Sequence, residues 1–200
     1  MGRPREHDLD DLLDHARRLW ARDGIAGVTL RALSRASGVP NGAIYHAVGS
    51  RDGLLAQVWC RDAAAFLAFQ RNAIDGVAPS DPVSAIVAAA CAPAAFAETE
   101  PDRAAVLLST TADDLPTDRL NDADRARVRA QKRQLGELVA DLADRRWGRR
   151  DRAALAVVTM CLVDLPGALL LARGRIADPL ARHALEVAVR AVAAEPLPSR

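Results

Sequence analysis

Side chains that could bind another molecule are concentrated between Thr29 and Arg51. The stretch offers hydroxyl, guanidinium, amide, phenol and imidazole groups, and no aspartate or glutamate occurs from Gly24 to Arg51. Hydroxyl, guanidinium and phenol groups donate to phosphate oxygens, and an asparagine can make two hydrogen bonds to the edge of an adenine. Residues of these types, with no acid among them, favour contact with a nucleic acid.

The same stretch predicts two short helices joined by a glycine turn. Thr29 is a good N-cap for a helix that directs Leu30 and Leu33 inward. Gly38 tolerates the positive φ that a sharp turn needs, and Pro40 suits the first turn of the next helix, where a missing N–H costs nothing. A helix-turn-helix of this kind places its second helix in the major groove of DNA.

Small and apolar residues support this packing. Ser34, four residues before Gly38, is small enough for two helices to cross closely, and Ile44 directs the second helix at the core. Gly49 ends the second helix, and Ser50 caps the helix that follows. The alternative is a generic three-helix bundle that touches no DNA, which the lack of acid on this stretch argues against.

The rest of the chain predicts an all-α fold. Half of the residues are hydrophobic, mostly alanine and leucine, and only 4% are aromatic. Apolar residues at helical spacing from residue 9 to residue 20 predict a first helix that stops at Gly24. Later helices are expected over residues 51–72, 82–99, 101–112, 118–146, 151–173 and from 179 onward. The net charge of +1 says little about partners, because a DNA-binding face needs local positive charge.

The apolar segment 153–172 is long enough to span a bilayer. Asp164 near its middle and its many alanines argue against insertion, so we expect a helix buried between proteins or subunits. The first eight residues lack the apolar core of a secretion signal. The three cysteines are odd in number and far apart, which fits reduced thiols in the cytoplasm better than disulfides or metal ligands.

Catalytic signatures are missing from the sequence. It contains no nucleophile elbow, no zinc-binding His-Glu-x-x-His, no Cys-x-x-Cys and no glycine-rich nucleotide loop. We expect no enzyme activity, no catalytic residue, no metal and no cofactor.

Residues 27–55, GVTLRALSRASGVPNGAIYHAVGSRDGLL, resemble the DNA-binding domain of the tetracycline-repressor-like (TetR/AcrR) family of bacterial regulators. The family pattern is roughly Thr-x-x-x-Ile-Ala-x-x-Ala-Gly-Val-Ser-x-Gly-x-Leu-Tyr-x-His-Phe, followed by Lys-x-x-Leu. The resemblance covers about residues 9–60, and beyond residue 60 only the layout of the helices is similar.

The resemblance implies DNA-contacting roles for nine residues. Thr29 caps its helix and contacts phosphate, and Arg31 reaches a base edge or the backbone. Tyr45 binds phosphate, as does Arg51 together with the N-terminal amides of its helix. The remaining contacts come from the second helix: Pro40, Asn41, Gly42, Ala43 and His46.

Plainer interpretations stay open for three of these residues. Tyr45 could be a half-buried aromatic without a partner, Asn41 a polar surface residue, and His46 a solvent-exposed or capping residue.

Three positions depart from the family pattern. Pro40 stands where serine is frequent, so one hydroxyl contact to phosphate is missing. Ala47 stands where histidine or tyrosine is common, and it cannot donate to phosphate. Val48 replaces the usual phenylalanine and fills less of the core. These changes predict weaker or more shape-dependent DNA binding.

A single unit of this kind reads few base pairs, whereas a symmetric dimer reads a palindrome. The apolar helix 153–172 needs apolar partners on more than one side, and pairing with its symmetry mate in a four-helix bundle would supply them. The resemblance implies the same homodimer through the last two helices. The alternative is a single monomeric core.

The resemblance also implies a small-molecule effector that moves the two DNA-reading units apart. We expect a helix-turn-helix domain over residues 1–50 and an effector-binding and dimerisation domain over residues 51–200. Candidate effector contacts, each of which could instead be plain core, are Trp59, Phe66, Phe96, Trp147, Met160 and Asp164. Asp164 could bind a cationic or hydroxylated ligand, pair with an arginine, or lie solvated at an interface.

The sequence thus predicts a transcriptional regulator, specifically a repressor released from a palindromic operator by an effector. An activator or ligand-independent DNA binder remains possible, as does a small-molecule-binding protein with a vestigial helix-turn-helix.

Overall fold

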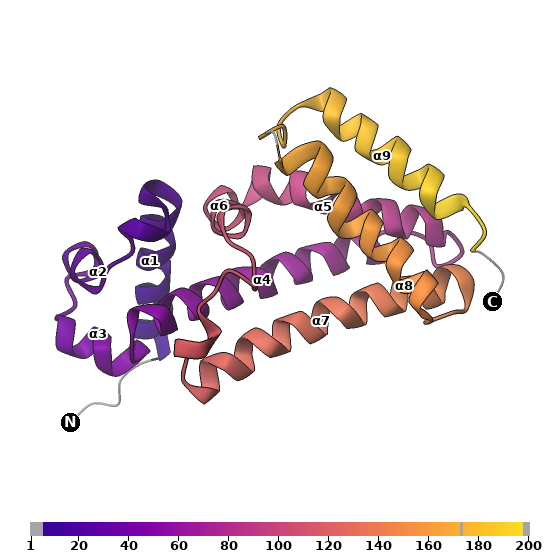
Figure 1. The fold of residues 1–200 in the computed structure, drawn as a ribbon. Coiled ribbons are helices and arrows are strands. Elements are labelled where there is room, and N and C mark those ends of the chain that lie inside the picture. Colours follow the sequence, from indigo (N-terminus) through magenta and orange to yellow (C-terminus); the bar gives the residue numbers. More distant parts are fainter. Residues whose placement is uncertain (1–5, 173, 198–200) are drawn as a thin grey trace. The chain divides into compact units, whose positions relative to one another are not determined.

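The computed structural model describes residues 6–172 and 174–197 of the chain. All regular elements within these ranges are helical (Figure 1), which confirms the expected all-α fold. Residues 1–5, where the segment considered for a secretion signal begins, lie outside the described residues. So does Arg173, the expected end of the apolar helix.

The helices form two compact units, and we describe each by itself. The first unit contains the residues up to 64 and residues 100–132. Its elements are α1 (Glu6–Gly27), α2 (Leu30–Ser37), α3 (Asn41–Val48), the first part of α4 (Arg51–Asp75), α6 (Pro101–Ser109), a short 3-10 turn (Thr117–Arg119) and the first part of α7 (Asp122–Trp147). We call α1, α2 and α3 the head. The functional boundary expected at residue 50 stays a prediction.

One apolar core holds the first unit together. Leu33 of α2 and Ile44 of α3 are fully buried, as their spacing predicts, and Trp20 of α1 lies in the same core. Val106 of α6 and Val128 of α7 also belong to it, so residues much later in the chain share one core with the head.

The second unit contains residues 65–99 and those from 133 onward. Its elements are the end of α4, α5 (Pro82–Thr99), the end of α7, α8 (Arg152–Thr159), two π-helical turns (Met160–Asp164 and Gly167–Leu171) and α9 (Pro179–Ala194). α5 packs against α9 in a core rich in small residues (Figure 1).

Pro166 lies between the two π-helical turns that continue α8. In these turns the N–H groups bond five residues back, from Leu165 to Met160 O and from Ala172 to Gly167 O. A proline cannot donate to the regular helix ladder, and a wider turn accommodates it. The irregularity at this proline is therefore a local widening of the helix.

A second proline removes a backbone hydrogen bond from α5, and a buried side chain replaces it. Pro93 lies inside α5 and has no N–H for the carbonyl of Ala89, four residues earlier. The amide Nε2 of Gln70 on α4 donates to that carbonyl at 2.8 Å, and the bond is buried. Gln70 thus supplies the hydrogen bond that Pro93 removes.

Two apolar helices, Pro82–Thr99 and Arg152–Leu171, are long enough and apolar enough to cross a membrane. The first is a core helix, with 44% of its apolar window buried. The second has 33% of its apolar window buried, and Met160, Val163 and Leu171 are among its exposed apolar residues.

The three cysteines are unpaired, as predicted. Burial raises the pKa of the Cys60 thiol to about 12 and that of the Cys161 thiol to about 11. These two thiols are therefore protonated and unreactive at neutral pH.

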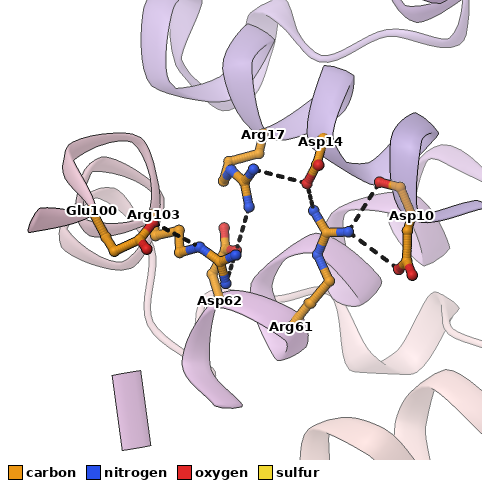
Figure 2. A network of polar contacts seen from close by, with 7 residues as sticks. All are labelled: Asp10, Asp14, Arg17, Arg61, Asp62, Glu100 and Arg103. Atoms are coloured by element: carbon orange, nitrogen blue, oxygen red, sulfur yellow. Dashed lines mark hydrogen bonds and ion pairs between the residues drawn. The ribbon is translucent and has the colours of Figure 1, made fainter. Parts of the chain in front are cut away.

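A network of charged side chains joins α1, α4 and α6 within the first unit (Figure 2). Asp62 of α4 lies at its centre, with its side chain fully buried. The Nη1 atoms of Arg17 on α1 and Arg103 on α6 lie 3.3 Å and 3.7 Å from the same atom, Asp62 Oδ1. Among the described residues, Asp62 Oδ2 has no hydrogen-bond partner.

The remaining pairs of this network tie α1 directly to α4. Asp14 of α1 accepts hydrogen bonds from Arg17, at 2.8 Å, and from Arg61 of α4. Arg61 also donates to the backbone and the side chain of Asp10 (Figure 2). The position of α1 therefore depends on charge pairs as well as on apolar packing.

Burial raises the pKa of the Asp62 carboxyl above its ordinary value, because the ionised form loses its hydration. The guanidinium groups of Arg17, Arg103 and Arg61 act in the opposite direction and do not fully compensate. A carboxyl with a raised folded-state pKa stabilises the fold fully only below its unfolded value, 3.8. That contribution is lost as the pH rises through the folded value.

We therefore expect a pH-dependent effect of the substitution Asp62→Asn. The free energy of unfolding of the wild type minus that of the variant should decrease as the pH is raised from about 4 to about 7. Urea unfolding followed by circular dichroism across this range measures the difference. A difference that increases with pH would show that the arginines outweigh burial and lower this pKa.

Candidate DNA-binding surface

The turn between α2 and α3 has the geometry that the sequence predicts. Thr29 Oγ1 accepts a hydrogen bond from the Ala32 backbone N–H at 3.1 Å and so caps α2. Gly38 has φ of 73°, in the left-handed region, and its N–H donates to Ser34 O at 2.9 Å. Because a side chain is strained at such a φ, glycine allows α2 to end and α3 to begin within three residues.

α3 divides into a buried side and an exposed side. Ile44 and Val48 are buried, whereas the Tyr45 side chain is 60% exposed. At about 100° per residue, Gly42 and His46 lie opposite Ile44. The exposed residues of this helix are Asn41, Gly42, Ala43, Tyr45, His46 and Ala47.

Further predicted contacts flank this exposed side. Thr29 and Arg31 are exposed at the start of α2, Arg35 is exposed one turn later, and Pro40 is exposed at the start of α3. Eight of the nine predicted DNA-contacting residues are thus accessible, and the ninth, Arg51, is half-buried.

Arg51 has a role that the sequence did not indicate. Its Nε donates to Val28 O at 2.6 Å, and its Nη2 donates to Ile25 O at 2.5 Å. Carbonyls at the end of a helix often lack intrahelical partners. The guanidinium supplies a donor to Val28 O and a second donor to Ile25 O, which also accepts from the Val28 N–H at 3.3 Å. A phosphate contact by Arg51 stays a prediction. The guanidinium would have to make that contact while it is also bonded to the two backbone carbonyls.

Two side chains lie at the N-terminal end of α4, whose amides are predicted to bind phosphate. Ser50 caps the helix as predicted, because its Oγ accepts a hydrogen bond from the Gly53 N–H at 2.9 Å. Asp124 of α7 is buried beside this end, with Oδ2 3.0 Å from where a Cβ on Gly53 would lie. Fewer α4 amides are therefore open to a phosphate than the sequence suggested.

A groove of about 620 Å³ runs between α1 and the α2–α3 pair, and the sequence did not indicate it. Ala43 and Ala47 of α3 line one side, and Asp11 and Asp14 of α1 lie on the other. Acidic groups thus lie on the α1 side of α3. Contacts with phosphate are more favourable on the opposite side, where Tyr45 lies.

The residues predicted to touch an effector are only partly brought together. Phe96 is buried in the second unit and forms edge-to-face pairs with Phe66, at 5.3 Å, and with Phe69, at 5.4 Å between ring centres. Trp59 belongs to the first unit, where its Nε1 donates to Thr110 O at 2.9 Å. Trp59 is thus a core residue with a satisfied indole.

The other three effector candidates lie at or near the surface of the second unit. Trp147 is half-buried, and its Nε1 donates to Glu195 O at 3.3 Å. Met160 and Asp164 are exposed. Exposure of Asp164 agrees with the solvated alternative, and its contact with an effector stays a prediction.

Comparison with known families identifies the first part of the chain. The sequence model of the family described as bacterial regulatory proteins, tetR family, matches residues 12–58. These residues cover most of α1, all of α2 and α3, and the beginning of α4. No curated protein matches the chain in sequence.

Solved structures share the fold over nearly the whole chain. The TetR family transcriptional regulator PfmR from Thermus thermophilus is 18% identical, with a TM-score of 0.65 over 92% of this chain and 99% of PfmR. The ketosteroid transcriptional regulator KstR2 of Mycobacterium tuberculosis is 16% identical, with a TM-score of 0.63 over 100% of this chain and 98% of KstR2. The superantigen PfiT is 20% identical, with a TM-score of 0.67 over 99% and 100%.

Identities of this size establish a common fold and no common activity. The match at residues 12–58 is more specific, because it covers the helices whose exposed side chains form the candidate surface. It agrees with the resemblance seen in residues 27–55. The chain carries the N-terminal domain and the fold of TetR-family transcriptional regulators.

Proposed function

We propose that the chain is a homodimeric repressor that binds a palindromic DNA operator through α3 and is released by a small molecule. The observation that carries the proposal is the exposed side of α3, which holds no acidic residue and lies within a matched TetR-family domain. A cytoplasmic location follows from this role.

DNA recognition is assigned to the exposed side of α2 and α3. Asn41, Gly42 and His46 would face the base edges, and the lack of a side chain on Gly42 permits close approach of the backbone. Thr29, Arg31 and Tyr45 would hold the phosphates on either side. The unit contributes few charged contacts, so a second copy is needed for tight binding.

An exposed apolar stripe along α9 supports the dimer. α9 buries Ala181, Leu185, Val189 and Ala193 against its own unit. Its opposite side carries exposed apolar residues at alternating spacings of four and three: Leu180, Ala184, Val187, Ala191 and Ala194. This spacing is typical of a helix that packs along another helix.

A second apolar stripe lies on the helix Arg152–Leu171, which is next to α9 (Figure 1). Its members are Ala156, Met160, Val163, Gly167 and Leu171, and all except the half-buried Gly167 are exposed. Two neighbouring helices with uncovered apolar stripes can pair with the same two helices of another copy to form a four-helix bundle. The exposed apolar side chains of Met160, Val163 and Leu171 support this interface.

The effector is assigned to the second unit. Phe66, Phe69 and Phe96 form an aromatic cluster there, and such side chains favour an apolar or amphipathic molecule. Differential affinity of the effector for two arrangements of the dimer would supply the free energy for release.

Selection of bound duplexes from a random pool tests the proposal directly. We expect enrichment of a palindrome whose half-sites reflect the symmetry of the dimer. A reporter gene placed behind the selected sequence then tells repression from activation. A protein that enriches no sequence and binds no duplex at low salt contradicts the proposal and favours the vestigial helix-turn-helix.

The substitution Arg31→Gln should weaken binding to the selected duplex. If Arg31 neutralises one phosphate, the slope of log K against log salt concentration should become shallower by about one. Fluorescence anisotropy titrations at several salt concentrations measure both effects. Arg150→Gln is the matched control, because Arg150 forms exposed ion pairs in the second unit. Equal slopes for the wild type and Arg31→Gln would rule out this contact.

The substitution Val187→Asp should convert the dimer to a monomer, because a carboxylate would be buried in an apolar interface without a partner. Sedimentation velocity measures the change, and operator affinity should fall with it. Leu135→Asp on α7 is the control, since Leu135 is 36% exposed but lies on neither apolar stripe. If Val187→Asp remains a dimer, the α9 stripe is not the interface.

A further inference from the structure

α6 is fastened to the head by more than apolar contact. Trp20 Nε1 of α1 donates to Ser109 Oγ at the end of α6, at 3.1 Å. At the other end of α6, Arg103 lies 3.1 Å from Glu100 and 3.7 Å from the buried Asp62. The Asp62 contact is the one that continues to the head, because Arg17 of α1 uses the same carboxylate.

The two arginines meet at a single atom. Both approach Asp62 Oδ1, while Oδ2 has no hydrogen-bond partner among the described residues. Arg17 and Arg103 therefore share one acceptor, on a side chain that is fully buried. The buried Asp62 carboxylate cannot find a substitute partner in solvent, so a change in one arginine alters its interaction with the other.

Each of the two arginines also has a second carboxylate partner on its own side of the network. Arg17 has Asp14 as a second partner, at 2.8 Å, and Arg103 has Glu100. Each arginine can thus shift toward its own helix or toward Asp62. The network has two acceptors for each cation and one shared centre (Figure 2).

We propose that Asp62 is a positioning residue that couples α6 to the head, so that binding of DNA at α3 and the order of α6 depend on each other. This inference rests on the proposed DNA-binding function. Asp62, Arg17 and Arg103 touch no predicted DNA contact, and they act by holding α1 in the orientation that supports α2 and α3. Because the coupling is an equilibrium property, it works in both directions.

Hydrogen exchange of the wild-type protein tests the coupling without any substitution. Addition of the selected operator duplex should slow exchange of the amides in α6, residues 101–109, by about fivefold or more. Slower exchange confined to α1, α2, α3 and the start of α4 would overturn the proposal. In the Asp62→Asn variant the head should still be protected by DNA, but the protection of α6 should be lost.

A mutant cycle gives the second measurement. Arg103→Gln should weaken operator binding by about threefold to tenfold, although Arg103 is not a predicted DNA contact. In an Asp62→Asn background the same substitution should have no further effect, because the carboxylate charge that Arg103 shares with Arg17 is already gone. Arg150→Gln in the second unit should leave binding unchanged in both backgrounds.

The outcomes separate this proposal from the one on which it rests. A wild-type protein that binds no duplex contradicts both. A protein that binds its operator, but with equal effects of Arg103→Gln in the two backgrounds, contradicts the coupling alone. Lower thermal stability of the variants with unchanged operator affinity and unchanged α6 protection would show that the network is structural only.

Discussion

The packing of α2 against α3 is the constraint on which the candidate surface depends. Leu33 and Ile44 are fully buried on either side of the turn at Gly38, so the rotation of α3 about its own axis is fixed. The helical period then leaves the opposite side of α3 in solvent. One helix can support the core and present side chains to a partner because these two faces are separate. Any change in how Ile44 is buried would turn every exposed residue of α3 with it.

Several arginines of the first unit stabilise its fold and are therefore not free to bind DNA phosphates. Arg51 is bound to two backbone carbonyls near the end of α1, and Arg17, Arg61 and Arg103 are bound in the network around Asp62. Buried carboxylates and the carbonyls at the end of a helix both need donors, and arginine provides several in fixed directions. A count of basic residues in this region therefore overstates the number of phosphates that the head can neutralise.

Local chemistry was enough to predict most of the helices. Thr29 caps α2, Gly38 turns the chain and Ser50 caps α4, each through hydrogen bonds within a few residues. α7 is an exception, because it starts at Asp122 rather than residue 118, after a short 3-10 turn at Thr117–Arg119. The exposed side of α3 was also predictable, since it follows from residue spacing once Ile44 is taken as buried.

The sequence by itself determined the helical fold, the turn at Gly38 and the type of surface on α3, because caps, turns and helical periods act over a few residues. Only the tertiary structure decided that Arg51 clamps the backbone, that Gln70 satisfies the carbonyl left by Pro93, and that Asp62 joins three helices. The residues in these contacts lie 19 to 45 positions apart in the chain, and some of the contacts join a side chain to a backbone carbonyl. No local pattern records such pairings, since they exist only once packing has brought the elements together.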